Sequence, residues 1–186
     1  MLSVAECWDF LEAEVGGPAI LPPGASEAAI QQAEATMGVA FPADLRTLLL
    51  RHDGSGDYCI APYKLGGGEQ YFMALDRSLY IWEGMAITGA MCDEDGEFGK
   101  QVGPIKQHYW NKRWIPFTDS RCGDSLVIDL DPPDDGTLGQ VVDWWHEGGV
   151  STFQSPSLRE WLNEVVAEIK NGVYEFRYCY DDDAEQ

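Results

Sequence analysis

The order of the hydrophobic patterns along the chain constrains its fold more than any other feature. Apolar residues recur every three or four positions in three N-terminal segments, residues 2–15, 26–37 and 42–49, which is the spacing of one helix face. A glycine-containing break follows each segment, and Ser26 and Pro42 suit the starts of the second and third. The N-terminal third of the chain is therefore predicted to be helical.

The middle of the chain has the short aromatic and aliphatic runs that are typical of strands. Two strands are predicted within residues 58–74, on either side of a turn at Gly66 to Gly68. Three more are predicted at residues 114–117, 125–130 and 140–145. We expect the last two to form an antiparallel pair, because the turn between them is rich in Asp, Pro and Gly.

The closing helix has the clearest boundaries. Ser157 and Glu160 have the spacing of a capping box, and the apolar residues that follow them recur at helical intervals. Gly172 is expected to end this helix, and an edge strand is predicted within residues 173–180. Residues 181–186, with the sequence DDDAEQ, are predicted to be an acidic disordered tail.

The chain is strongly acidic, with 32 Asp and Glu against 12 Lys and Arg and a formal net charge of −20. Nucleic-acid phosphates and anionic membranes would both repel it, so nucleic-acid-binding and membrane-binding proteins are excluded. The length of 186 residues and 45% hydrophobic side chains fit one domain. The N-terminus carries acids in place of the basic stretch of a secretory signal, and we predict a cytoplasmic location.

The five cysteines are widely separated and never arranged as CxxC. We therefore predict no disulfide framework, which agrees with a reducing compartment. No zinc is expected, because none of the three histidines has a Cys or His at ligand spacing. Cys122, beside Gly123 and Asp124, is the only thiol considered as a nucleophile, and no motif supplies it with a base, so a packed or turn cysteine is favoured.

Two groups of carboxylates stand out. The first follows a predicted helix over residues 75–91, is expected to form a loop, and contains Asp93, Glu94, Asp95 and Glu97. The second lies at the turn after a predicted strand and contains Asp129, Asp131, Asp134 and Asp135. Neither has acids at positions 1, 3 and 5 with Gly at 6, as a calcium-binding loop requires, so no metal or other cofactor is expected. Two interpretations of these carboxylates remain: they are ordinary solvated surface charges, or they bind a partner.

Two adjacent tryptophans, Trp144 and Trp145, fall in a predicted strand and must point to opposite faces of the sheet. Whichever one faces outward needs a covering helix or a partner. Five tryptophans are interpreted mainly as core residues, with an aromatic groove or interface as the alternative: Trp110, Trp114, Trp144, Trp145 and Trp161.

Four stretches then occur in a recognisable order, GVAFPADLRTLLLRHDGS at residues 38–55, WIPF at 114–117, GD at 123–124 and DLDP at 129–132. With helices at both ends, this order resembles the SUKH superfamily, which includes the fungal Smi/Knr cell-wall synthesis regulators and many bacterial immunity proteins. The resemblance implies one α+β domain over residues 1–180, with an antiparallel-dominated sheet flanked by N-terminal and C-terminal helices. It carries over no catalytic residue.

Residues that recur in this family are interpreted as determinants of the fold. In this sequence they are Pro42, Gly54, Trp114, Gly123, Asp124 and Asp129. Gly54 and Gly123 are expected to adopt positive φ in turns, and Asp124 to accept hydrogen bonds from nearby backbone donors.

The resemblance also implies a function, because bacterial members of the family are typically antidotes that bind a cognate toxin, often a nuclease or deaminase. The acidic surface agrees, since it would attract a basic protein. We therefore predict a non-catalytic immunity protein whose toxin-binding residues lie in the segments 93–97 and 129–135. The alternative is a regulatory or scaffold module of the cell-wall regulator type; an enzyme is the third and least supported class, because no nucleophile and base are identifiable.

Overall fold

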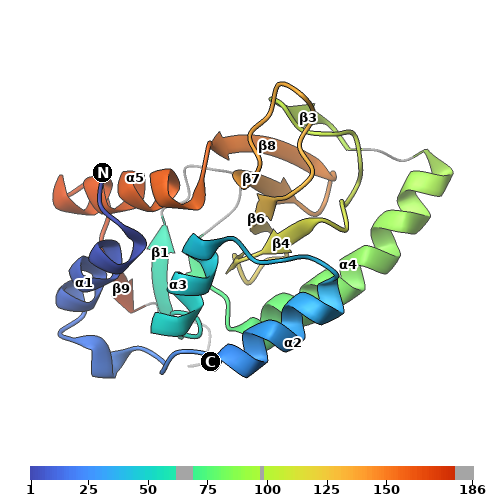
Figure 1. The fold of residues 1–186 in the computed structure, drawn as a ribbon. Coiled ribbons are helices and arrows are strands. Elements are labelled where there is room, and N and C mark those ends of the chain that lie inside the picture. Colours follow the sequence, from blue (N-terminus) through green and yellow to red (C-terminus); the bar gives the residue numbers. More distant parts are fainter. Residues whose placement is uncertain (62–68, 97–98, 179–186) are drawn as a thin grey trace, which may run out of the picture.

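The computed structural model describes residues 1–61, 69–96 and 99–178 (Figure 1). The helices are α1 (Val4–Glu14), η1 (Pro18–Ile20), α2 (Glu27–Met37), α3 (Ala43–Arg51), α4 (Leu75–Asp95) and α5 (Leu158–Lys170). The strands are β1 (Tyr58–Ala61), β2 (Gln70–Phe72), β3 (Gln101–Val102), β4 (Trp114–Pro116), β5 (Thr118–Asp119), β6 (Ser125–Asp129), β7 (Gln140–Trp145), β8 (Val150–Ser155) and β9 (Arg177–Tyr178). The predicted α+β fold, with helices at both ends, is confirmed.

The strands form two sheets, with the orders β5-β2-β1-β9 and β3-β8-β7-β6-β4. Every pairing is antiparallel except that of β3 with β8, so the sheets are antiparallel-dominated as expected. The predicted pairing of β6 with β7 is confirmed, with Val127 opposite Val142. β9 is the predicted edge strand and pairs with β1. The Gly66–Gly68 turn and the 181–186 tail lie outside the described residues.

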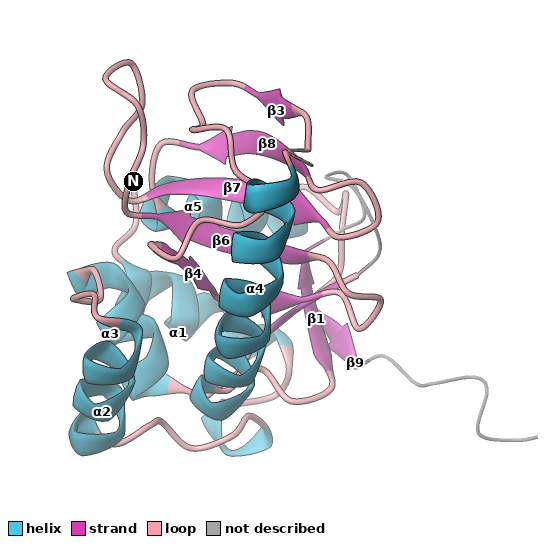
Figure 2. Ribbon diagram, turned by 90° about the vertical axis from the view of Figure 1, so that its right-hand side faces the viewer, coloured by secondary structure: helices cyan, strands magenta, loops and turns pink. Residues whose placement is uncertain are grey.

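The five-stranded sheet lies between two layers of helices (Figure 2). On one face, Val127, Val142 and Trp144 pack with Trp82 and other apolar residues of α4. On the opposite face, apolar side chains of β6 and β7 join α1, α3 and α5 in the largest core cluster, where Trp161 of α5 is buried. Both faces of the central strands are therefore covered.

Serine side chains cap the starts of α1, α2 and α5, and α2 begins where its cap predicts. The Ser26 hydroxyl accepts a 3.1 Å hydrogen bond from the Ala29 backbone amide at the start of α2. α1 begins with a complete capping box of Ser3 and Glu6, which the sequence analysis did not recognise. At α5 the Ser157 hydroxyl accepts from the Glu160 backbone amide at 3.2 Å, whereas the Glu160 carboxylate accepts from that same hydroxyl and not from the cap backbone.

Replacing Ser26 with alanine is expected to destabilise the protein by about 1 kcal/mol, because an amide of the first turn of α2 loses its acceptor. Urea unfolding measures the change as a lower midpoint with an unchanged slope. Ser26→Asp keeps an acceptor at the cap and should stay close to the wild type. An equal loss in both variants would show that the cap hydrogen bond is not the cause.

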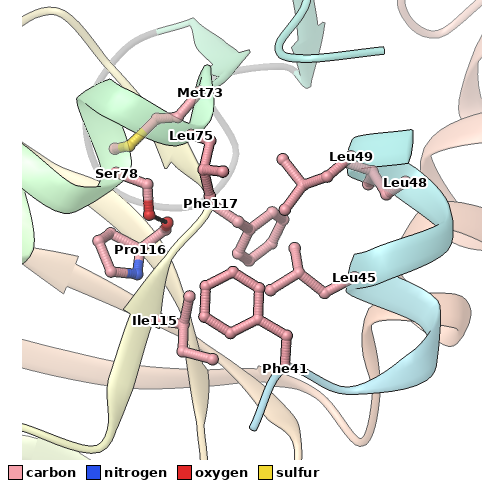
Figure 3. Close-up of a pocket in the computed structure, with 10 residues that line it drawn as sticks. All are labelled: Phe41, Leu45, Leu48, Leu49, Met73, Leu75, Ser78, Ile115, Pro116 and Phe117. Atoms are coloured by element: carbon pink, nitrogen blue, oxygen red, sulfur yellow. Dashed lines mark hydrogen bonds between the residues drawn. The ribbon is translucent and has the colours of Figure 1, made fainter. Parts of the chain in front are cut away.

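The interior between α3 and β4 is apolar and nearly filled. Figure 3 shows Leu45 and Leu49 of α3 facing Phe41, Phe117 and Ile115 across a cavity of about 10 Å³. At its margin the Ser78 hydroxyl donates a 2.6 Å hydrogen bond to the Pro116 carbonyl. A space of this size with an apolar lining holds at most one water, so it is a packing gap and not a ligand site.

One expectation about the chain needs correction, and one disulfide bond was not predicted. The segment that begins at Asp93 was expected to be a loop, but α4 continues through Asp95 and ends at Gly96, whose φ of 75° closes the helix. Cys59 is disulfide-bonded, whereas Cys7, Cys92 and Cys122 are free thiols. The cysteine spacing predicted no disulfide framework and gave no sign of this bond at Cys59.

Sequence analysis also missed three strands. β3 and β5 contain two residues each, which is too short for a periodic pattern. β8 has the sequence VSTFQS, in which polar residues outnumber apolar ones. β3 and β5 are fixed by pairing with strands distant in sequence, β8 and β2, whereas β8 also pairs with β7, which immediately precedes it.

Candidate protein-binding site

The two predicted groups of acidic residues divide into exposed and structurally engaged carboxylates. Glu94 and Asp95 are exposed in the last turn of α4, and Asp134 and Asp135 are exposed in the turn between β6 and β7. Asp93 and Asp131 are half-buried, and Asp129 is fully buried. Glu97 lies outside the described residues.

Asp93 fixes the end of α4 to the segment that follows it. Its carboxylate accepts a 2.9 Å hydrogen bond from the Tyr109 backbone amide and lies 2.8 Å from Nδ1 of His108. These contacts explain why an acidic stretch is helical even though carboxylates at a helix C-terminus oppose the helix dipole, and no basic residue lies in this last turn. Glu94 and Asp95 thus add negative charge to an end of the helix that is already negative.

Asp129 is a structural residue and not part of a surface. Its carboxylate accepts hydrogen bonds from the Asp131 backbone amide at 2.8 Å and from Nε2 of Gln140 at 3.0 Å. Burial raises the pKa of Asp129, which these hydrogen bonds partly oppose. The prediction that Asp129 contacts a partner is therefore wrong, because no side-chain surface of this residue is available.

Asp131 is held by an ion pair. Its carboxylate lies 2.6 Å from Nζ of Lys106 and accepts a 3.1 Å hydrogen bond from Nδ2 of Asn111. The hydrogen bond from Lys106 is the main cause of a lowered pKa at Asp131. A partner would have to compete with Lys106 for this carboxylate, so Asp131 contributes less free negative charge than its exposed neighbours Asp134 and Asp135.

One segment links the two acidic groups. Lys106 contacts Asp131 and His108 contacts Asp93, so two positions with a single residue between them hold both groups. Trp144 of β7 anchors this segment from below, because its indole donates a 2.9 Å hydrogen bond to the Tyr109 carbonyl. Both acidic groups are therefore attached to one segment, which is itself held by a hydrogen bond from the sheet.

The Gly123-Asp124 turn before β6 is tightly built. The φ of Gly123 is 105°, and a Cβ at this position would lie 2.8 Å from Nδ1 of His146. Asp124 is buried and accepts from the His146 backbone amide at 3.0 Å, and its carboxylate lies 2.8 Å from Nδ1 of the same residue. Cys122 is an exposed free thiol, and its backbone amide donates a 3.1 Å hydrogen bond to the Ser120 hydroxyl, so hydrogen bonding and steric fit account for this turn.

The other motif residues support the fold in distinct ways. Gly54 has a φ of 88°, and a Cβ there would lie 2.7 Å from the Ala74 backbone amide. Pro42 is the N-cap residue of α3, one position before the helical position expected. Trp114 is buried and stacks edge-to-face on Trp110 with 5.7 Å between ring centroids. None of these side chains presents chemistry to solvent.

Of the two adjacent tryptophans, Trp144 is buried and Trp145 is 39% exposed, which confirms that they face opposite sides of the sheet. Trp110, Trp114 and Trp161 are buried, so the core interpretation of these three is confirmed. No aromatic groove is formed by them.

A hollow of about 440 Å³ lies beside the start of α4, and its lining combines apolar residues such as Phe72 with the charged side chains of Arg77, Asp119 and Arg121. Its arginines are already engaged, since Nε of Arg77 lies 2.9 Å from Asp119 and a guanidinium nitrogen of Arg121 lies 2.6 Å from Asp57. The Arg121 guanidinium also lies 3.8 Å from the centre of the Tyr71 ring. Within the described ranges, no group of three or more His, Cys, Asp or Glu is arranged to hold a metal ion.

Residues 24–164 match the family model described as the SMI1 / KNR4 family (SUKH-1). The chain belongs to this family. A curated relative, "KNR4/SMI1 homolog 2" of Debaryomyces hansenii, is 27% identical over 78 residues, which make up 41% of this chain and 13% of that protein. The chain thus spans only a small part of that relative's length.

The SUKH-1 match begins before α2 and ends within α5, so it includes both acidic groups and all the motif residues named above. Membership of the family points to protein–protein interaction. No helix of the described residues has the length and apolar character needed to cross a bilayer.

Sequence analysis missed one surface. Tyr80, Ile87 and Met91 on α4 are each more than half exposed, whereas the apolar residues singled out on this helix, among them Trp82 and Met85, pack inward. The spacing of seven and four residues between the three exposed side chains could have indicated this surface, because it places them on one helix face.

Proposed function

We propose that this SUKH-1 protein is a non-catalytic immunity protein that binds and neutralises a basic toxin domain such as a nuclease. One observation carries the proposal: Glu94, Asp95, Asp134 and Asp135 stay exposed, while their neighbours Asp93 and Asp131 are held by hydrogen bonds and ion pairs. The exposed carboxylates are available to a partner, and the engaged ones keep their supporting backbone in place.

Electrostatics gives this arrangement a clear physical role. A net charge of −20 attracts a positively charged protein over distances of about a Debye length and raises its association rate at low salt. A nuclease groove that binds phosphates is basic, so an acidic protein surface can occupy it in place of the substrate. This role needs no cofactor and no catalytic residue. We place it in the cytoplasm of the producing cell.

The test is affinity purification of the tagged chain from its native host at near-physiological salt, repeated at high salt, with mass spectrometry of the retained proteins. We expect one basic toxin-domain protein in equal stoichiometry, with recovery reduced at high salt because the attraction is screened. The recovered toxin should lose its activity when the purified chain is added at a one-to-one ratio. Full toxin activity in the presence of excess chain would contradict the proposal.

A regulatory or scaffold module is the second candidate. It is supported by the match to the Debaryomyces hansenii relative, which is named as a KNR4/SMI1 homologue. In this case the same purification would recover cell-envelope or signalling proteins, with binding that tolerates moderate salt. The two candidates therefore differ in the identity of the retained protein and in its salt dependence.

A further inference from the structure

The outer face of α4 carries an apolar stripe, defined here as Tyr80, Gly84, Ile87 and Met91. Tyr80 is 69% exposed, Ile87 67% and Met91 62%. The positions are separated by four, three and four residues, so their side chains follow one face of the helix. Of the 21 residues of α4, only Leu75, Ser78 and Gly89 are buried, which leaves a long part of this helix available from outside.

The position of α4 in the fold leaves this stripe uncovered. Figure 2 views the molecule from the side on which α4 crosses the five-stranded sheet, and no other helix or strand is drawn in front of it. A hollow of about 350 Å³ lies along the same helix and is lined by residues that include Tyr80, Gly84 and Ile87, with Gly123 from the turn before β6 and Trp144 from β7.

Gly84 is a second, independent feature of the stripe. A glycine inside a helix is unfavourable relative to alanine. At Gly84 a Cβ would meet no atom within 4 Å, so packing within the described chain does not require glycine there. Glycine at an exposed helix position between two large apolar side chains permits another backbone to approach closely.

Charge around the stripe defines the kind of occupant. Asp76, Glu83, Glu94 and Asp95 are exposed on α4, and the one exposed cation of this helix, Arg77, is paired with Asp119. A second copy of this chain would bring the same carboxylates and a net charge of −20 to the interface, which opposes self-association. A basic partner meets no such repulsion.

We propose that the apolar stripe of α4 binds an amphipathic helix of a basic protein, with apolar side chains at intervals of three and four residues flanked by Lys and Arg. This inference rests on the proposed function, because it assumes a protein partner, and it identifies the surface and the shape of that partner's contact. Apolar contacts with the stripe supply affinity, and the surrounding carboxylates select positive charge.

The first test uses synthetic 18-residue peptides and the purified full chain. The probe is a Leu/Lys peptide with its leucines on one helix face; the comparison peptides are a Leu/Glu version and a scrambled Leu/Lys sequence of equal charge. Fluorescence anisotropy measures affinity, and NMR of methyl-labelled methionine reports contact at Met91. We expect binding of the Leu/Lys peptide at least tenfold tighter than that of either comparison peptide.

Variants locate the contact. Ile87→Ser combined with Met91→Ser should weaken binding of the Leu/Lys peptide at least tenfold, while Leu138→Ser, which removes an apolar side chain 70% exposed elsewhere, should leave it unchanged. Gly84→Ala should raise the unfolding midpoint and weaken binding, because its methyl group occupies the site of close approach. Equal binding by the wild type and the Ile87/Met91 variant, or no difference among the peptides, would overturn the proposal.

The outcome is separable from that of the proposed function. Sedimentation velocity of the wild type at high concentration tests a second copy as the occupant, and a dimer lost in the Ile87/Met91 variant would overturn the choice of a basic partner. If a recovered toxin is neutralised equally by the wild type and by this variant, the stripe is not its contact, whereas the proposed immunity function stands.

Discussion

Asp143 is expected to make the free energy of unfolding of the wild type fall by about 2 to 3 kcal/mol between pH 5 and pH 8. The Asp143→Asn variant should not show this fall. Asp143 lies in β7, is 6% exposed, and leaves Oδ1 without a hydrogen-bond partner among the described residues. Burial, together with the negative charge of Asp124, raises the pKa of Asp143 from its ordinary value of 3.8 to about 7.

The sign of the effect follows from the direction of this pKa shift. A carboxyl group that is harder to ionise in the folded state than in the unfolded state stabilises the fold while it is protonated. That contribution is complete below the unfolded pKa, near 3.8, and it is lost as the pH rises through the folded pKa of about 7. Asparagine is neutral throughout this range, so the variant lacks this part of the pH dependence.

Urea unfolding of the wild type and of Asp143→Asn at pH 5, 6, 7 and 8 measures the difference. Other buried groups titrate equally in both proteins, so the gap between the two curves isolates Asp143, provided that His146 still pairs with Asp124. Asp134→Asn removes an exposed carboxylate from the turn after β6 and serves as the matched control. Parallel profiles for the wild type and Asp143→Asn would show that folding does not raise the pKa of Asp143.

Local patterns predicted most of the helices because their causes are local. Ser26 caps α2 through an amide three residues away, and the apolar face of α5 needs only its own spacing. The true end of α4 depends on a different kind of contact, since Asp93 binds the amide of Tyr109, 16 residues further along the chain. Nothing near Asp93 in the sequence indicates that partner.

The sequence predicted which acidic residues belong to the candidate site, but not which of them are exposed to solvent. Asp129 and Asp134 belong to the same acidic turn, yet Asp129 ends a strand covered on both faces and Asp134 lies beyond it in solvent. In a sheet packed between two helical layers, alternation of polar and apolar residues no longer separates inside from outside. Asp143 in the neighbouring strand illustrates the same limit, because its charge suggested nothing about its burial.

Reversing the charge of the exposed carboxylates is expected to slow association with the basic partner about tenfold or more at low salt. The variants are Glu94→Lys with Asp95→Lys at the end of α4, and Asp134→Lys with Asp135→Lys in the turn after β6. Both pairs are exposed, so the protein should remain folded. The dissociation rate should change less than the association rate, because solvated charges act mainly on the encounter.

A control pair of charge reversals at a distant surface distinguishes the effect of charge at the proposed site from the effect of the total net charge. Glu14→Lys with Glu175→Lys changes the net charge by the same amount, at exposed positions near α1 and β9 on the opposite side of the molecule from the end of α4 (Figure 1). Stopped-flow association with the recovered partner, measured from low to high salt, should show a larger effect for the two site pairs and convergence as screening increases. If the control pair slows association as much as the site pairs, the total charge steers the partner and neither acidic group forms its binding site. If only one site pair slows association, the partner contacts only that acidic group. The segment that carries Lys106 and His108 then supports the fold and does not join the two acidic groups into one binding surface.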